Sequence, residues 1–156
     1  MKAKNVFFIC LAAFSPIVLN SCKEDSDVEK PVITLIEPAE GDALQIGGEH
    51  GVHFEAEFSD NEMLASYKVN IHPDFDDHTH ARTRASSEPT VDFEYEQSWT
   101  ISGKNASIHH HEITIPENAT PGDYHLMVYC TDAAGNESHI AVDVELSHEA
   151  GEGHAH

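Results

Sequence analysis

Histidine is the residue type that stands out in this sequence, because it occupies 13 of the 156 positions. Between residues 72 and 80 the histidines follow the pattern His-x5-His-x-His. Imidazole nitrogens suit Zn²⁺, Cu and Ni, and a zinc site gathers three or four ligands at about 2.0–2.1 Å from the ion. The spacing therefore predicts a transition-metal site.

The predicted ligands come from a strand and the loop after it. His78 and His80 lie two residues apart, so on an extended segment both imidazoles share one face. His72 precedes them across a turn, and a loop that folds back on its strand would bring all three rings to one ion. We expect His125 and Asp76 to support them, with Zn²⁺ as the ion and Cu or Ni as alternatives. Because imidazole binds a metal only when neutral, affinity should fall below about pH 6.5.

Other polar clusters allow weaker hypotheses. In the triplet His109-His110-His111 only His109 and His111 share a strand face. Strand order predicts that these two lie near His139, at the end of the domain opposite to His72. A polar start to a strand explains the triplet equally well. Asp60-Asn61-Glu62 and residues 132–136 are rich in oxygen ligands for a hard ion such as Ca²⁺, but neither has EF-hand spacing, so we expect turns.

The elements that must position these residues are short strands. From Pro31 onwards apolar and polar residues alternate, and turns recur about every ten residues, which is typical of an all-β sandwich. A Gly-x-Tyr motif at Gly122 and Tyr124 resembles the tyrosine corner of immunoglobulin-like domains. We expect one seven-stranded immunoglobulin- or fibronectin-like sandwich over residues 31–147 and a disordered tail over residues 148–156. The expected strands cover residues 32–36, 52–58, 64–72, 90–101, the stretch ending at 115, 124–130 and 140–146.

Strand direction assigns most histidines to one end of this sandwich. Consecutive strands run in opposite directions, so the end of the third strand, the starts of the second and sixth and the end of the seventh meet there. His72 and His125 should lie on the outer face of neighbouring strands. His50 and His53 belong to the opposite sheet. The histidines expected at this end are His50, His53, His72, His78, His80, His125 and His148.

Residues 1–21 have the pattern of a secretory signal. Lys2 and Lys4 precede an apolar run that is shorter than the roughly 20 residues needed to cross a bilayer. The run ends in Leu19-Asn20-Ser21-Cys22, which resembles a bacterial lipobox, in which the cysteine becomes lipidated. Residues 22–30 are acidic and should form a solvated tether. They resemble the export signal of Bacteroidota-type surface lipoproteins, which implies a lipid anchor at Cys22 in the outer membrane, facing the cell surface.

The remaining composition limits the class of function. A net charge of -20 disfavours nucleic acid or an anionic membrane surface as a partner and favours cations. Cys130 lies on the inward face of its strand, so it should be a core residue and not a nucleophile or ligand. The sequence contains no phosphate loop, nucleophile elbow or His-Glu-x-x-His helix, and we expect no enzyme activity.

A series of motifs resembles a family of Bacteroidota lipoproteins with an Ig-like domain of unknown function. The resemblance implies a fold and a location, but it implies no activity. The motifs that carry it occur in this order: residues 60–67 (DNEMLASY), residues 71–80 (IHPDFDDHTH), residues 113–116 (ITIP), Gly122 with Tyr124, and Asp132, Gly135 and Asn136.

Two functional hypotheses follow. The first is a surface lipoprotein that binds a transition metal to scavenge, buffer or deliver it, with an outer-membrane transporter as a partner. The second is an Ig-like interaction module for a polysaccharide or protein at the cell surface, which requires an exposed aromatic platform. The candidates for that platform are Trp99, Tyr129 and Phe75.

Overall fold

The computed structural model of the chain describes residues 27–74 and 89–150. Within these ranges no helix is long and apolar enough to cross a membrane. The described residues form eight strands: β1 (Val32–Glu37), β2 (Asp42–Gln45), β3 (Val52–Ser59), β4 (Leu64–Pro73), β5 (Tyr95–Thr100), β6 (Asn105–Ile113), β7 (Gly122–Asp132) and β8 (Glu137–Ser147).

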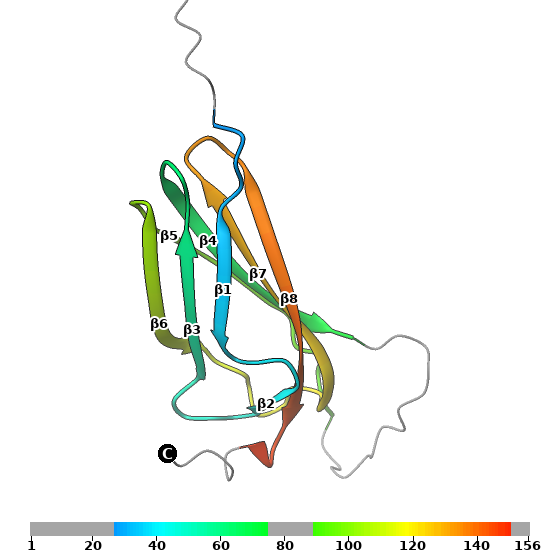
Figure 1. The fold of residues 1–156 in the computed structure, drawn as a ribbon. Coiled ribbons are helices and arrows are strands. Elements are labelled where there is room, and N and C mark those ends of the chain that lie inside the picture. Colours follow the sequence, from blue (N-terminus) through cyan, green and yellow to red (C-terminus); the bar gives the residue numbers. More distant parts are fainter. Residues whose placement is uncertain (1–26, 75–88, 151–156) are drawn as a thin grey trace, which may run out of the picture.

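The strands form two sheets that pack face to face, as predicted for an all-β sandwich (Figure 1). One sheet has the order β1-β3-β6 and the other the order β2-β8-β7-β4-β5. Neighbouring strands are antiparallel except β2 and β8, which are parallel. This order, with the first strands shared between the two sheets, is immunoglobulin-like.

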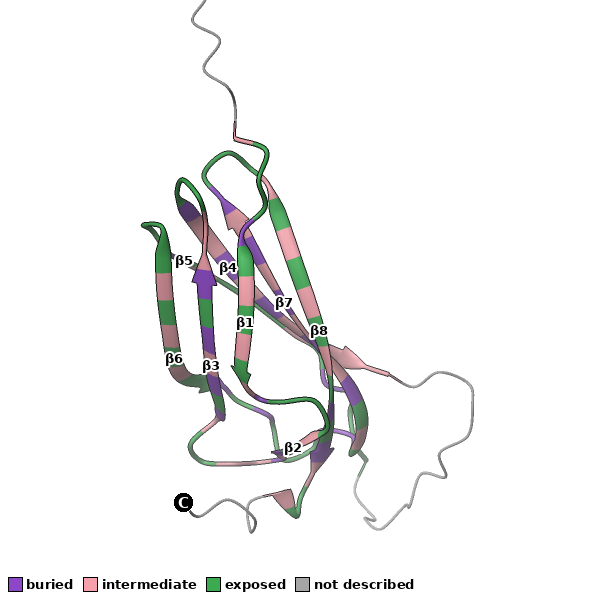
Figure 2. Cartoon of the chain, viewed as in Figure 1, coloured by how far each residue is buried: buried purple, intermediate pink, exposed green. Residues whose placement is uncertain are grey.

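Alternation of apolar and polar side chains explains both the strands and the core. Along β3 the residues Val52, Phe54, Ala56 and Phe58 are buried, and the residues between them face outward (Figure 2). β7 repeats the pattern with Tyr124 to Cys130. Burying one large apolar side chain contributes about 1.5–3 kcal/mol. A shift of one residue in strand pairing would expose these side chains, so their burial specifies the register of the strands.

The sandwich has two ends. The tether end consists of residues 27–30 with the turns between β3 and β4 and between β7 and β8, at the top of Figure 1. The far end consists of the starts of β3 and β7 and the ends of β4, β6 and β8, in the lower half of Figure 1.

The strand count differs from the seven expected, because β2 was not predicted. β2 has four residues, and Leu44 is the one of them that is buried. Such a short segment has no visible alternation, and it becomes a strand only through its pairing with β8. The strand expected over residues 90–101 is also shorter: it begins at Tyr95, while Val91 forms an isolated bridge to Ala119.

The tyrosine corner predicted from the Gly-x-Tyr motif is present. The Tyr124 hydroxyl donates a hydrogen bond to the carbonyl oxygen of Thr120 at 2.8 Å and accepts one from the Phe93 amide at 3.2 Å. Tyr124 itself is fully buried. These bonds tie the connections that precede β5 and β7 to the core.

Cys130 is a core residue, as expected, and we predict that its thiol is unreactive. Burial, followed by the nearby carboxylates of Asp60 and Asp132, raises the pKa of Cys130 to about 11, so the thiol stays neutral at pH 8. Iodoacetamide at pH 8 should therefore leave Cys130 unmodified in the native protein and alkylate it in denaturant, as measured by peptide mass spectrometry. Equal alkylation rates in the two states would contradict this burial.

Candidate metal centre

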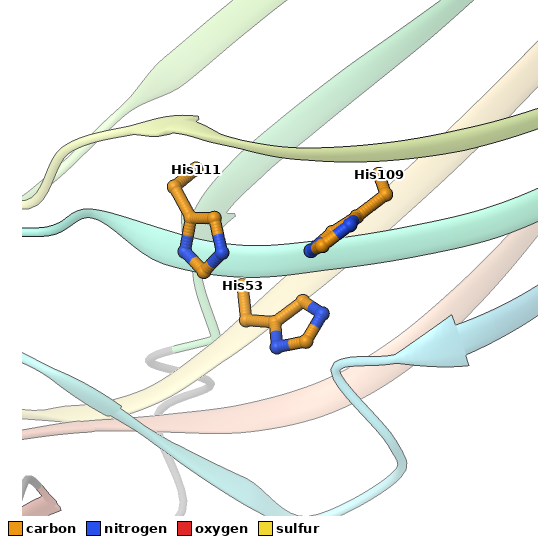
Figure 3. Close-up of side chains that lie close together, drawn as sticks. All are labelled: His53, His109 and His111. Atoms are coloured by element: carbon orange, nitrogen blue, oxygen red, sulfur yellow. The ribbon is translucent and has the colours of Figure 1, made fainter.

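Three histidines converge on the outer face of the three-stranded sheet (Figure 3). His53 lies at the start of β3, and His109 and His111 lie on β6. The ring centroid of His53 is 4.7 Å from that of His109 and 4.9 Å from that of His111. One nitrogen of each ring lies within 4.8 Å of the corresponding nitrogens of the other two. We call this group the sheet cluster.

A β-bulge brings the three side chains together. Val52 pairs with Ile113 but Phe54 pairs with His110, so β6 has one residue more than β3 between these pairs. Alternation along β6 then turns His109 and His111 outward, and the bulge returns Ile113 to the core, where it is fully buried. His53, between Val52 and Phe54, faces outward beside both histidines.

The glycine before β3 allows this close approach. Gly51 has a φ of 71°, and a Cβ atom at this position would lie 2.2 Å from the carbonyl oxygen of His111. A side chain at this position is therefore excluded, and the backbone before His53 can pass directly against the bulge. The glycine positions the sheet cluster without contributing a ligand.

The middle histidine of the triplet packs inward. The ring of His110 lies 4.9 Å from the ring of Phe54 and 4.9 Å from that of Trp99. Burial lowers the pKa of His110, although the carboxylate of Glu112 opposes the change. His110 is therefore an aromatic packing residue that separates the two outward-facing histidines.

The geometry of the sheet cluster suits a metal ion with nitrogen ligands. Around a tetrahedral zinc ion with bonds of about 2.0–2.1 Å, ligand nitrogens are about 3.4 Å apart. All three side chains are exposed, so rotation about their side-chain bonds can close the remaining gap. The Glu55 carboxylate lies 3.8 Å from His53 Nε2 and can occupy a fourth position or orient the ring.

The second group of histidines was predicted from the spacing around residue 72. As predicted, His72 and His125 lie on neighbouring strands, β4 and β7, where they are directly opposite each other with ring centroids 5.6 Å apart. His72 Nδ1 is hydrogen-bonded to the side-chain oxygen of Asn70 at 2.8 Å. The other predicted ligands lie outside the described residues: Asp76, His78 and His80.

His125 already has a carboxylate at each ring nitrogen. Its Nδ1 lies 2.7 Å from Asp143 and its Nε2 lies 3.2 Å from Asp74. The three residues offer ligand atoms within 4.8 Å of one another. A metal ion bound to His125 must displace at least one of these contacts, so this site is less open than the sheet cluster.

The prediction that His109 and His111 lie at the opposite end, near His139, is wrong. β6 pairs antiparallel with β3, so its second half lies beside the start of β3, toward the far end. His139 instead lies beside Tyr129, with ring centroids 5.6 Å apart. The strand order of an immunoglobulin-like sandwich, in which these two strands are neighbours, is the signal that could have placed them.

The fold and the sheet cluster together define an immunoglobulin-like β-sandwich with an exposed group of histidines on one sheet. The chain belongs to a family described as a domain of unknown function (DUF4625), which matches residues 20–147. No curated protein matches the chain. The match covers the sandwich and the described residues before it, 27–30.

Proposed function

We propose that this protein is a surface-anchored lipoprotein whose Ig-like domain binds a transition-metal ion, Zn²⁺ before Cu or Ni. The observation that carries the proposal is the sheet cluster, in which neighbouring strands present three imidazoles with ligand nitrogens within 4.8 Å of one another. Nitrogen ligands favour transition metals over Ca²⁺ or Mg²⁺. Binding would serve to scavenge, buffer or deliver the ion, with an outer-membrane transporter as the receiving partner.

The exposure of the site favours reversible capture of the ion. Structural zinc sites are closed by four protein ligands, whereas sites with three ligands keep an open position. The sheet cluster has three histidines in contact with solvent, so a water molecule or a ligand from a partner can complete the coordination. A site of this kind can release its ion to a partner.

The position of the sheet cluster fits attachment through Cys22. The described chain begins at the tether end, whereas His53 lies at the start of β3, near the far end (Figure 1). A domain anchored through the segment before residue 27 would therefore present the cluster away from the membrane. The net charge of -20 would raise the local concentration of cations.

The alternative function, an interaction module, has less support from the aromatic residues. Trp99 is only partly exposed: its ring stacks on Tyr67 at 4.8 Å, and its indole nitrogen donates a hydrogen bond to Glu112 at 2.8 Å. Tyr129 lies under the Lys68 ammonium group, 4.3 Å from the ring centroid. The third candidate, Phe75, lies outside the described residues.

Calorimetric titration of Zn²⁺ tests the proposal and separates the two groups of histidines. Protein purified without a His tag or nickel column should bind Zn²⁺ after treatment with EDTA and dialysis. The variant His72/His78/His80→Ala should retain one equivalent, because the sheet cluster is unchanged in it. Equal heats from the variant and the wild type would remove the predicted loop site, and complete loss of binding in the variant would remove the sheet cluster as the main site.

A further inference from the structure

Three carboxylates meet at the tether end, far from the sheet cluster. Asp27 lies in the segment before β1, Asp60 in the turn after β3, and Asp132 at the end of β7. One oxygen of each lies within 4.8 Å of the corresponding oxygens of the other two. Within residues 27–74 and 89–150, none of the three is ion-paired with a Lys, Arg or His side chain.

Hydrogen bonds hold each carboxylate in a fixed orientation. Asp27 Oδ1 accepts a hydrogen bond from the Asn61 side chain at 3.0 Å. Asp60 Oδ2 accepts hydrogen bonds from the amides of Glu62 and Met63, at 2.8 and 2.7 Å. The two oxygens of Asp132 accept from the amide and the side chain of Asn136, each at 2.7 Å.

Two other oxygens of these carboxylates are buried without a hydrogen-bond partner in the described part of the chain. Asp27 Oδ2 and Asp60 Oδ1 are fully enclosed, and neither has a hydrogen-bond partner among the described residues. A carboxylate oxygen withdrawn from water without a partner is unfavourable, and a second carboxylate nearby makes it more so. A bound cation would satisfy both oxygens.

The third carboxylate adds a buried negative charge to this group. Asp132 is only 3% exposed. Burial alone would raise the pKa of Asp132, but the hydrogen bonds from Asn136 and from the neighbouring backbone outweigh it and hold that pKa below its usual value. Asp132 is therefore ionised at neutral pH, and its negative charge belongs to the same group as the carboxylates of Asp27 and Asp60.

We propose that Asp27, Asp60 and Asp132 bind a hard divalent cation, Ca²⁺, and we call this group the carboxylate triad. Ca²⁺ takes oxygen ligands at about 2.3–2.6 Å, so two oxygens on opposite sides of one ion are about 4.8 Å apart. The triad consists of oxygen ligands within that span of one another. Water molecules would supply the remaining ligands. This site differs in ligand type and in place from the proposed transition-metal site.

A cation at the carboxylate triad would attach the tether to the domain. Asp27 comes from the segment before β1, whereas Asp60 and Asp132 come from two turns of the sandwich. The Asn136 side chain also donates a hydrogen bond to the backbone oxygen of Asp27 at 3.2 Å, so this segment already lies against the domain. The bound ion would therefore set the direction in which the chain leaves the sandwich toward residue 22.

Calcium titration of the purified, EDTA-treated protein tests the site. We expect one Ca²⁺ per chain with a Kd of about 10⁻⁴ to 10⁻³ M, the range of extracellular modules. The substitution Asp27→Asn should weaken binding about tenfold or more, because it removes one ligand charge outside the strands. Glu29→Gln removes the same charge from an exposed neighbour and should leave the affinity unchanged.

Two outcomes would overturn the carboxylate triad as a site. The first is no binding of Ca²⁺ at about 10⁻² M, above the range of weak sites. The second is equal affinity in the wild type and in Asp27→Asn. A variant in which His53, His109 and His111 are replaced with alanine should bind Ca²⁺ as the wild type does, so failure of one metal site is distinguishable from failure of the other.

Hydrogen exchange of the wild-type protein provides a measurement that does not depend on the folding of a variant. Ca²⁺ should slow amide exchange in residues 27–30 and in the turn at residues 60–63, because the ion joins these two segments. Exchange around His53 should not change. Unchanged exchange in residues 27–30 at saturating Ca²⁺ would contradict attachment of the tether by the ion.

Discussion

Replacing His53, His109 and His111 with alanine is expected to abolish Zn²⁺ binding at the sheet cluster and to leave the fold intact. All three side chains are exposed, and surface substitutions usually change stability by about 0.5 kcal/mol or less each. The metal, in contrast, would lose all of its protein nitrogen ligands at this site. Calorimetric titration, with competition against a chromophoric chelator, measures the loss, and thermal unfolding checks the fold.

A matched control removes the same number of exposed histidines elsewhere. His50, His139 and His148 are exposed and lie outside the sheet cluster. The variant His50/His139/His148→Ala should therefore bind Zn²⁺ with wild-type affinity. If it loses as much affinity as the cluster variant, Zn²⁺ is held by scattered imidazoles, and the cluster is not the site.

The substitution Gly51→Ala should destabilise the domain and weaken Zn²⁺ binding together. The new Cβ would lie 2.2 Å from the carbonyl oxygen of His111 and 2.9 Å from that of Ile113. The backbone of β6 must then move away from the start of β3, which displaces His111 relative to His53. A left-handed residue costs about 1–2 kcal/mol and overpacking about 1–3 kcal/mol, so we expect a loss of about 3 kcal/mol.

Urea unfolding and Zn²⁺ titration of this variant measure both effects. Gly41→Ala is the matched control, because Gly41 also has a positive φ, of 81°, but a Cβ there has no atom within 4 Å. The control should lose only the left-handed backbone term of about 1–2 kcal/mol and keep wild-type Zn²⁺ affinity. Equal losses in the two glycine variants would show that contact with the bulge does not position the cluster.

Alternation of apolar and polar residues, together with one turn motif, predicted part of the fold. The buried residues of β3 and β7 and the tyrosine corner at Tyr124 follow from side chains two residues apart and from one turn motif. The prediction that His72 and His125 lie on neighbouring strands followed from alternation together with the expected immunoglobulin-like topology. The first two features are determined within one strand or one turn, whereas the third also requires the strand order of the sandwich, because β4 and β7 are not consecutive in the chain.

The sheet cluster could be predicted only in part. Alternation correctly put His109 and His111 on one face of a strand and turned His110 to the other. Their neighbour His53 lies on a strand that is nearly sixty residues earlier in the chain, and a bulge on β6 sets the register between them. A shift of one residue would turn His111 to the other face, and no local pattern specifies that shift.

The sequence by itself determined that this chain is an all-β sandwich with alternating inner faces, an excess of negative charge and many histidines. Only the tertiary structure decided which of those histidines meet, that residues 42–45 become a strand, and that Asp27 lies against two distant turns. The physical reason is that the alternation of apolar and polar side chains is a property of residues close together in the chain. Strand pairing, bulges and the docking of the tether depend instead on contacts between segments far apart in the chain.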